Sequence, residues 1–376
     1  MGKVAFINRN NLKIARENIG MDVFIASKKI SKSKKEYVSL WESGEELPTW
    51  SQIKKLANIY GVSELSLVSK IDIEKNKDIP DFRVGLSADE KNDVKKLLNL
   101  VLKRQKWLQE FLKKEGYKKN QLLGSGKNLT SAVALANNIA DSLKIDLEEI
   151  KSMSGVGAYR KALKYLITKA EDQGIFVGKT ISYHKIPVEH MRGLFVSNDY
   201  CPFIILNRQD SITAQIFSFI HELAHFFRKS ESISNSIDFR DSNNIQNTEE
   251  VFCNKVAAEL LLPEKEFERD NYNKQDILVI GEKYKVSPLF VFYRLKNLKK
   301  LNGSSLSELE EYLQKQSNIN VEGKRSKNKG GNFYNNMKDS NGELFNKIIA
   351  SSYFENKINF VEASNLLKFS VGVYEY

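Results

Sequence analysis

The sequence predicts an α+β fold: an all-α N-terminal domain, then a small sheet packed with helices, then a helical C-terminal region. Three observations predict it. Short helical stretches separated by turn residues fill about the first 70 positions. Apolar segments of strand character lie between residues 174 and 207. Apolar residues at helical spacing then surround a closely spaced histidine pair. A chain of 376 residues is long enough for two or three such domains.

The N-terminal domain, predicted at residues 1–72, contains five short helical stretches. Gly20, a turn rich in serine and lysine, Pro48 and Gly61 separate them. The predicted helices span residues 12–18, 21–28, 34–42, 49–61 and 63–69. Five helices of this length suit a helix-turn-helix module, in which the third helix enters the major groove of DNA.

Basic side chains gather before and at the start of that third helix. Lysine and arginine outnumber acidic residues over 1–41, whereas acidic residues predominate over 42–80. This distribution predicts contacts to DNA phosphates. The residues expected to make them are Lys28, Lys29, Lys32, Lys34 and Lys35. The alternative is a protein-binding platform, because no glutamine stands at the start of the second helix, where it commonly clamps the DNA backbone.

The middle of the chain changes from helical to strand character. Residues 73–150 are predicted to form a helical linker or scaffold, in which 97–116 has the apolar spacing of an amphipathic helix. Strands are expected within GIFVGKTISYH, RGLFVS and PFIILN, the last ending at residue 207. An exposed edge of this sheet would suit an extended peptide. His184 and His190 lie here, and we expect surface histidines rather than groups that steady a transition state.

Residues 217–229 read FSFIHELAHFFRK and contain two of the four histidines of the chain. This is the HExxH pattern, in which helical spacing presents two imidazoles to one metal ion. On a helix, His221 and His225 lie on one side with Glu222 next to them, while apolar side chains crowd the opposite arc. This separation favours a metal site over two hydrogen-bonded histidines on a buried helix.

Catalytic zinc usually takes three protein ligands, so a third ligand must lie elsewhere in the chain. Residues 247–264, NTEEVFCNKVAAELLLPE, predict a helix with Glu249 and Glu250 in its first turn. Glu250 and Asn254 share a face, so a carboxylate can reach the metal while the amide supports a ligand. Acidic residues are also common at a helix N-terminus without any ligand role.

The quoted segments resemble the ImmA/IrrE metallopeptidases, in the form fused to an N-terminal Cro/C1-type (XRE) helix-turn-helix domain. EVFCNKVAAELLLP, residues 250–263, is similar to the family segment that follows HELAH, with Cys253 among its departures. Further similar segments lie at 192–207 and 284–298. The resemblance implies that the third ligand is Glu250 rather than Glu249.

The resemblance also implies a minimal zincin-like metallopeptidase domain at residues 151–302, with Zn²⁺ held by His221, His225 and Glu250. Glu222 is then the base that takes a proton from the attacking water. The implied substrate is a protein, a helix-turn-helix repressor whose cleavage derepresses mobile-element or stress genes. The alternative is a transcriptional regulator or antitoxin-like DNA-binding protein with a structural or inactive zinc site, which would not need Glu222.

The remaining segments and the composition complete the prediction. Residues 303–331 are polar and lysine-rich, which predicts a flexible basic linker, and 332–376 predict a helical C-terminal region. The net charge of +11 favours an anionic partner such as double-stranded DNA. No apolar run approaches a membrane span and no signal core is present, so we expect a cytoplasmic protein without a membrane partner. Cys201 and Cys253 are too few for a disulfide framework.

Overall fold

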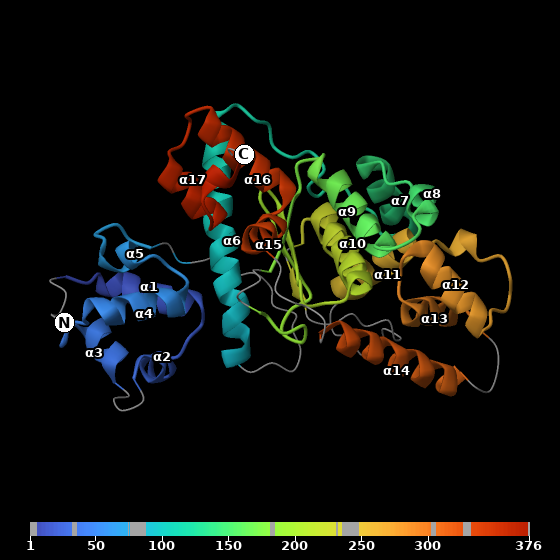
Figure 1. Cartoon of the computed structure of the whole chain (residues 1–376), viewed down its shortest axis with the longest axis horizontal. Helices are drawn as coiled ribbons and strands as arrows, with labels where there is room; N and C mark the ends of the chain where they lie inside the picture. Colours follow the sequence, from blue (N-terminus) through green and yellow to red (C-terminus); the bar gives the residue numbers. More distant parts are fainter. Residues whose placement is uncertain are drawn as a thin grey trace. The chain divides into compact units, whose positions relative to one another are not determined.

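The computed structural model describes residues 6–31, 36–73, 75, 88–180, 185–230, 232–234, 248–301, 306–325 and 332–374. The chain divides into two compact units, one of residues 1–79 with 83–107 and one of residues 80–82 with 108–376. The long helix α6 (Ala88–Lys114) begins in the first unit and ends in the second. Figure 1 labels the helices of both units.

The first unit contains five short helices at the places where the sequence predicts them. They are α1 (Arg9–Asn18), α2 (Val23–Ile30), α3 (Tyr37–Ser43), α4 (Trp50–Tyr60) and α5 (Glu64–Val68). Thr49 and Gln52 form a capping box at the start of α4. Gly44 and Gly61 end α3 and α4 in the left-handed conformation that favours glycine. The five helices are confirmed, and their use as a helix-turn-helix stays a prediction.

The core of the first unit is built from one apolar face of each of these helices. Trp41 of α3 and Tyr60 of α4 are its largest buried side chains. Arg16 of α1 pairs with Glu42 of α3 across 2.7 Å between Nε and Oε1, beside this core. The apolar spacing along α1, α3 and α4 therefore specifies a small domain with its own core.

The second unit is built around a four-stranded sheet. Its strands are β1 (Phe176–Lys179), β2 (Gly193–Val196), β3 (Phe203–Leu206) and β4 (Ser232–Ser234), in the order β1-β3-β2-β4. β1 and β3 are parallel, whereas β2 is antiparallel to both β3 and β4. The first three strands lie in the three predicted segments. β4 is absent from the prediction because Ser-Ile-Ser carries too little apolar pattern.

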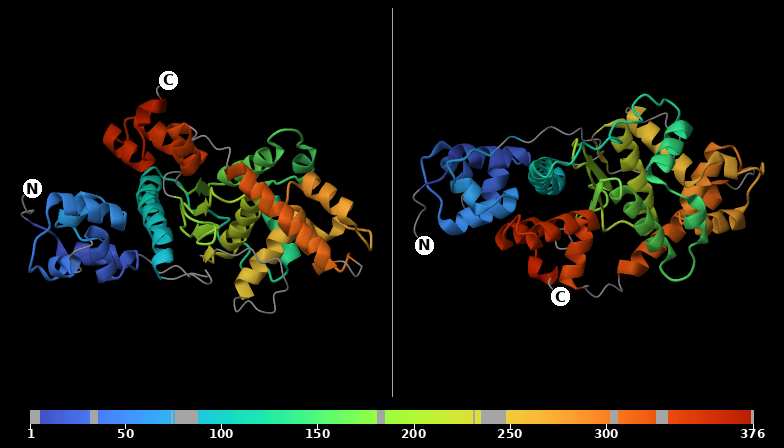
Figure 2. Two further views of the ribbon diagram at one scale, coloured as in Figure 1. Left: turned by 60° about the horizontal axis from the view of Figure 1, so that its bottom comes forward. Right: turned by 90° about the horizontal axis from the view of Figure 1, so that it is seen from above.

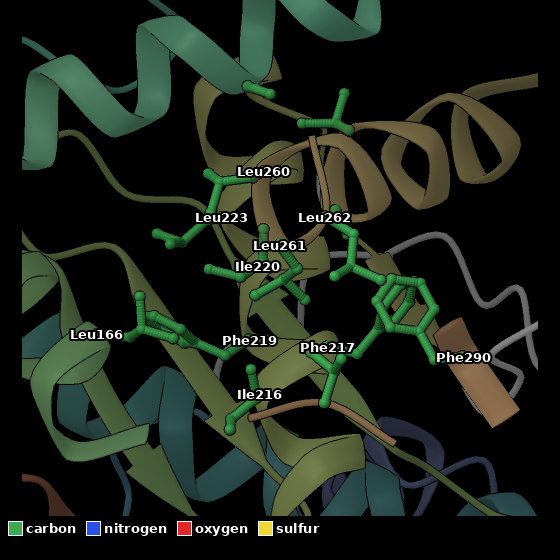
Figure 3. Packing of buried hydrophobic residues seen from close by; sticks show 14 of the residues in the cluster. Leu166, Ile216, Phe217, Phe219, Ile220, Leu223, Leu260, Leu261, Leu262 and Phe290 are labelled. Carbon is green, nitrogen blue, oxygen red and sulfur yellow. The ribbon is translucent and has the colours of Figure 1, made fainter. Parts of the chain in front are cut away.

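Helices cover this sheet and pack on one another beside it. They are α7 (Ala132–Leu143), α8 (Leu147–Ser152), α9 (Ala158–Glu171), α10 (Ile212–Arg228), α11 (Thr248–Leu261), α12 (Lys274–Tyr284) and α13 (Pro288–Asn297). α10 lies between the strands β2 and β3 on one side and α11 on the other (Figure 2). Figure 3 shows Ile220 and Leu223 of α10 beside Leu260 and Leu261 of α11 in the apolar core. Burial of these side chains fixes α10 against α11.

Residues 306–325 form the helix α14 (Leu306–Arg325), so the prediction of a flexible basic linker over 303–331 is wrong for this part of the chain. Leu306, Leu309 and Leu313 lie three and four residues apart and pack against the core of the second unit. Leu313 is fully buried. The three leucines stand among many charged residues, so the polar composition of the segment masks its apolar spacing.

The C-terminal region is helical, as predicted for residues 332–376. Its helices are α15 (Phe333–Asn341), α16 (Glu343–Phe354) and α17 (Phe360–Leu367). α15 and α16 pack closely against β1, and this approach requires glycine at two places. A Cβ at Gly178 would lie 2.7 Å from the carbonyl oxygen of Ser340. A Cβ at Gly342, whose φ is +86°, would overlap the carbonyl oxygen of Val177.

Glu171, at the end of α9, joins the C-terminal helices to the rest of the second unit. Its Oε1 accepts a hydrogen bond of 3.1 Å from the backbone N–H of Leu344. Burial raises the pKa of this carboxyl from 4.5 to about 7. A carboxyl whose folded-state pKa is raised stabilises the fold below its unfolded pKa, and this contribution is lost as the pH rises through the folded-state value.

We therefore expect the free energy of unfolding of wild type to fall by up to about 3 kcal/mol between pH 4.5 and pH 7 relative to Glu171→Gln. Urea unfolding across this pH range measures the difference. Glu264→Gln, which changes an exposed glutamate, is the matched control and should keep the wild-type dependence. If the free energy of unfolding of Glu171→Gln changed with pH in the same way as that of wild type, Glu171 would not be the source of this pH dependence.

Candidate metal centre

Helix α10 carries the histidine pair and its neighbouring glutamate in the core of the second unit. The side chain of Ser211 caps its start, and Lys229 ends it in the left-handed conformation. Because His221 and His225 are one turn apart, they lie on the same side of the helix. Both are buried, and Glu222 is fully buried. Buried polar side chains need partners, so the neighbours of these three residues define the site.

Helix α11 brings Glu250 to the two histidines. Nε2 of His221 lies 3.1 Å from Oε2 of Glu250, and Nε2 of His225 lies 3.1 Å from Oε1. The two Nε2 atoms are also 3.1 Å apart. The structure therefore brings together the three side chains predicted as ligands, with Glu250 rather than Glu249 in the third position.

The three side chains fit a metal ion shared between them. Donors that lie about 2.0–2.1 Å from one tetrahedral zinc ion are about 3.3 Å apart, close to the 3.1 Å separations of this site. Oε1 of Glu250 is buried and, although it lies 3.1 Å from Nε2 of His225, it has no partner at good hydrogen-bonding geometry within the described part of the chain. Buried carboxylate oxygens normally have one, and an ion between the three donors would supply it.

A second group of potential ligands, His225, Glu249 and Cys253, overlaps the first. Arg228 holds Glu249 through two hydrogen bonds, of 2.9 Å from Nε to Oε1 and 3.0 Å from Nη2 to Oε2. Burial raises the pKa of the Cys253 thiol well above its usual value, and nearby acidic side chains add to this effect. The thiolate that binds metals is therefore disfavoured, and the first group is the better candidate.

Glu250 and His221 stabilise each other's charged forms. Burial lowers the pKa of His221, but its hydrogen bond with Glu250 and the nearby carboxylates outweigh burial and raise the pKa above the ordinary value. Burial likewise raises the pKa of Glu250, but the imidazoles of His221 and His225, each 3.1 Å from one of its oxygens, hold it well below its usual range. Glu250 therefore stays a carboxylate, which is the form that binds a cation.

The Glu222 carboxylate lies against the backbone of β2. A Cβ at Gly193, the first residue of β2, would overlap Oε1 of Glu222. Glu222 belongs to neither group of potential ligands among the described residues. The need for glycine at this position escapes sequence reasoning, because the contact joins a strand and a helix that are distant in the chain. The carboxylate is thus enclosed beside the predicted ligands without being one of them.

Asn254, the predicted supporting residue, lies one turn after Glu250 on α11 and interacts with His221. Its amide contributes to the raised pKa of the His221 imidazole. Oδ1 of Asn254 and Nδ1 of His221 are both buried, and neither has a partner at good hydrogen-bonding geometry among the described residues. The structure therefore places Asn254 beside the ligand candidate that it was expected to support.

Support for His225 comes from Ser230, which sequence reasoning missed, and through it from Glu249. Nδ1 of His225 lies 2.9 Å from Oγ of Ser230, which lies 3.1 Å from Oε1 of Glu249. The left-handed turn at the end of α10 brings Ser230 back to His225, and no motif marks this contact in the sequence. Of the other two histidines, His184 lies outside the described residues, and His190 belongs to neither group of potential ligands.

The residues predicted to bind DNA are only partly described. Lys28 and Lys29 lie in the last turn of α2, and both are exposed. Lys32, Lys34 and Lys35 lie outside the described residues. α3 carries no basic side chain from Tyr37 to Ser43, so the basic groups described in this area belong to α2.

The candidate metal centre lies within a region that matches a peptidase family model. Residues 177–296 match the family model Peptidase_M78, described as the IrrE N-terminal-like domain. The matched region extends from β1 into α13 and contains all three ligand candidates. It supports a metallopeptidase of the ImmA/IrrE kind. No curated protein and no solved structure matches the chain. None of the described helices is long and apolar enough to cross a membrane.

Proposed function

We propose that this protein is a zinc-dependent endopeptidase in which His221, His225 and Glu250 hold the metal and Glu222 acts as the base. The convergence of three donor side chains at mutual distances of 3.1 Å, in a region that matches a peptidase family, carries the proposal. Two imidazoles and one carboxylate leave one position of a tetrahedral ion open, as in catalytic zinc sites. Structural sites usually have four protein ligands instead.

The donor set favours zinc over the hard divalent cations. Calcium and magnesium prefer oxygen ligands, whereas two of the three donors here are imidazole nitrogens. A glutamate directly after the first histidine is typical of zinc peptidases, where it serves as general base. A fully buried glutamate beside the ligands has no use in a purely structural site, which supports an enzyme over a regulator with an inactive zinc site.

Glu222 performs the proton transfers of the proposed reaction. His221, His225 and Glu250 would hold the zinc ion, which when bound would polarise the scissile carbonyl and make water a stronger nucleophile. Glu222 accepts the proton that the attacking water loses as its oxygen bonds to the carbonyl carbon. It then donates this proton to the leaving nitrogen as the C–N bond breaks, so water is added across the peptide bond. Enclosure of the Glu222 carboxylate against Gly193 holds it in one orientation.

The proposed substrate is a helix-turn-helix repressor, the class that the family resemblance implies. β4 is the last strand in the sheet order and follows α10 in the chain. An extended peptide can add to such a strand through main-chain hydrogen bonds, which select an extended segment of the substrate. Incubation of the zinc-loaded protein with the repressor of a neighbouring gene, followed by mass spectrometry of the fragments, tests the proposed activity.

The first unit is proposed to bind double-stranded DNA. Lys28 and Lys29 support this assignment, because both are exposed at the end of α2, and lysine contacts to phosphate release counterions. Phe24 on the same helix is 60% exposed, which favours the alternative of a protein-binding platform. The salt dependence of binding distinguishes the two partners.

Lys28→Glu/Lys29→Glu is expected to weaken binding to duplex DNA. A plot of the logarithm of the affinity against the logarithm of the salt concentration should also become less steep, by about 0.9 for each phosphate that the variant no longer neutralises. Lys54→Glu/Lys55→Glu is the matched control, because both lysines are exposed on α4, and it should bind as wild type. Mobility-shift assays at several salt concentrations give the slope. Equal binding by all three proteins would favour the protein-binding platform.

A further inference from the structure

A chain of hydrogen bonds begins at the ligand candidate His225 and leads away from the metal centre. Nδ1 of His225 lies 2.9 Å from Oγ of Ser230. Oγ of Ser230 donates to Oε1 of Glu249 across 3.1 Å. Glu249 in turn accepts two hydrogen bonds from Arg228, of 2.9 and 3.0 Å. A ligand candidate is thus linked through one serine to a carboxylate held on both oxygens.

The end of α10 holds this chain in place through its backbone. Lys229 has a φ of 56°, and this left-handed residue turns the chain so that the N–H of Ser230 donates to the carbonyl oxygen of His225 at 2.9 Å. Nη1 of Arg228 donates to the carbonyl oxygens of Lys127 and Leu129, at 2.8 and 3.0 Å. The serine and the arginine are therefore fixed by contacts that do not depend on a metal.

The directions of these hydrogen bonds determine where His225 carries its proton. Glu249 is paired with Arg228 and, as a carboxylate, only accepts hydrogen bonds. Ser230 has one hydroxyl proton, which goes to Glu249, so its oxygen accepts the hydrogen bond from Nδ1–H of His225. A neutral imidazole protonated at Nδ1 has its lone pair on Nε2. Nε2 is the atom that faces His221 and Glu250.

We propose that Ser230 and Glu249 are positioning residues that hold His225 in the tautomer whose Nε2 binds the metal. The proposal rests on the proposed function for the identity of the metal, and it gives Glu249 a role other than that of a ligand. Hydrogen bonds of this kind orient ligand histidines and raise their basicity in metal sites. They act on His225 alone, because Nδ1 of His221 has no such partner among the described residues.

Zinc affinity measures the effect of this chain of hydrogen bonds. Competition with a chromophoric chelator is expected to show a dissociation constant about 10- to 100-fold higher for Ser230→Ala than for wild type. Ser230→Thr keeps the hydroxyl and should stay near wild type. Ser352→Ala is the matched control, because it also removes a serine hydroxyl. The hydroxyl of Ser352 donates a hydrogen bond to the carbonyl oxygen of Ile348 in the same helix, so this variant should bind zinc as tightly as wild type.

The tautomer of His225 distinguishes a positioning role of Ser230 from a purely structural one, because a purely structural role would leave the tautomer unchanged. Long-range ¹H–¹⁵N spectra of the metal-free protein, taken where both imidazoles are neutral, should show His225 protonated at Nδ1 in wild type and as a mixture in Ser230→Ala. The double variant Ser230→Ala/Glu249→Gln should bind zinc about as tightly as Ser230→Ala alone, because both changes break the same chain of hydrogen bonds. Wild-type affinity and an unchanged tautomer in Ser230→Ala would overturn the proposal.

The same measurements separate this proposal from the proposed function. A wild-type protein that binds zinc, loses affinity in Ser230→Ala and cleaves no repressor would support the positioning role and contradict the peptidase. A wild-type protein that binds no zinc would overturn both. A sulfur-to-cobalt charge-transfer band in the cobalt-substituted protein would overturn the positioning role, because it would make Cys253 a ligand and shift the metal towards Glu249.

Discussion

Replacement of Glu222 by glutamine is expected to reduce cleavage of a repressor by about 10²- to 10⁴-fold and to leave the zinc content unchanged. Glutamine has the same shape and a similar helix propensity, so it fits the space that Gly193 leaves for Glu222. It cannot accept the proton that the attacking water loses. Because Glu222 belongs to neither group of potential ligands among the described residues, the metal should remain bound.

Cleavage by purified zinc-loaded proteins gives kcat/KM, and elemental analysis gives the zinc content. Glu264→Gln, an exposed change on the same unit, should cleave as wild type. In cells that carry the neighbouring repressor, a blot for its fragments and the expression of its target genes report the same difference. A Glu222→Gln protein with normal zinc that still derepresses those genes as fully as wild type would exclude the peptidase and favour a regulator.

Replacement of Glu250 by glutamine is expected to remove most of the metal, from about one zinc ion per chain to well below one after exchange into chelator-treated buffer. The neutral amide lacks the charge of the carboxylate that lies 3.1 Å from each imidazole. We expect a loss of affinity greater than the 10- to 100-fold typical of a supporting residue. His225→Ala should have a similar effect, because it removes one of the three donors.

Glu249→Gln is the matched control, since it makes the same chemical change one residue earlier in α11. Its carboxylate is held by Arg228 and Ser230, so the variant should keep zinc at an affinity between those of wild type and Glu250→Gln. Elemental analysis of both variants, with circular dichroism to show equal folding, decides between them. Full zinc in Glu250→Gln together with loss of zinc in Glu249→Gln would show that the wrong carboxylate has been assigned.

The local spacing of residues in the sequence was sufficient to predict the helices that carry the candidate metal ligands. The spacing of His221 and His225 and the apolar arc opposite them are properties of one helix, and α10 confirms that helix. The helices of the first unit are bounded by side-chain caps and by glycines in the left-handed conformation, which are local signals as well. α14 was not predicted because its leucines stand among many charged residues. β4 was not predicted because it is only three residues long.

The sequence by itself determined that two imidazoles share one face of a helix and that two glutamates begin another. The helical pattern alone left open which glutamate meets the histidines, and the tertiary structure brings Glu250 to them, as the family resemblance implied. Adjacent residues on a helix point about 100° apart, and the packing of α11 on α10 turns Glu250 towards His221 and His225 and leaves Glu249 to Arg228. The contact of Ser230 with His225 has the same origin, because it depends on a turn of the backbone and on side chains from two helices. The spacing of apolar and polar residues is a property of one helix, whereas the way in which two helices pack against each other depends on the surfaces of both.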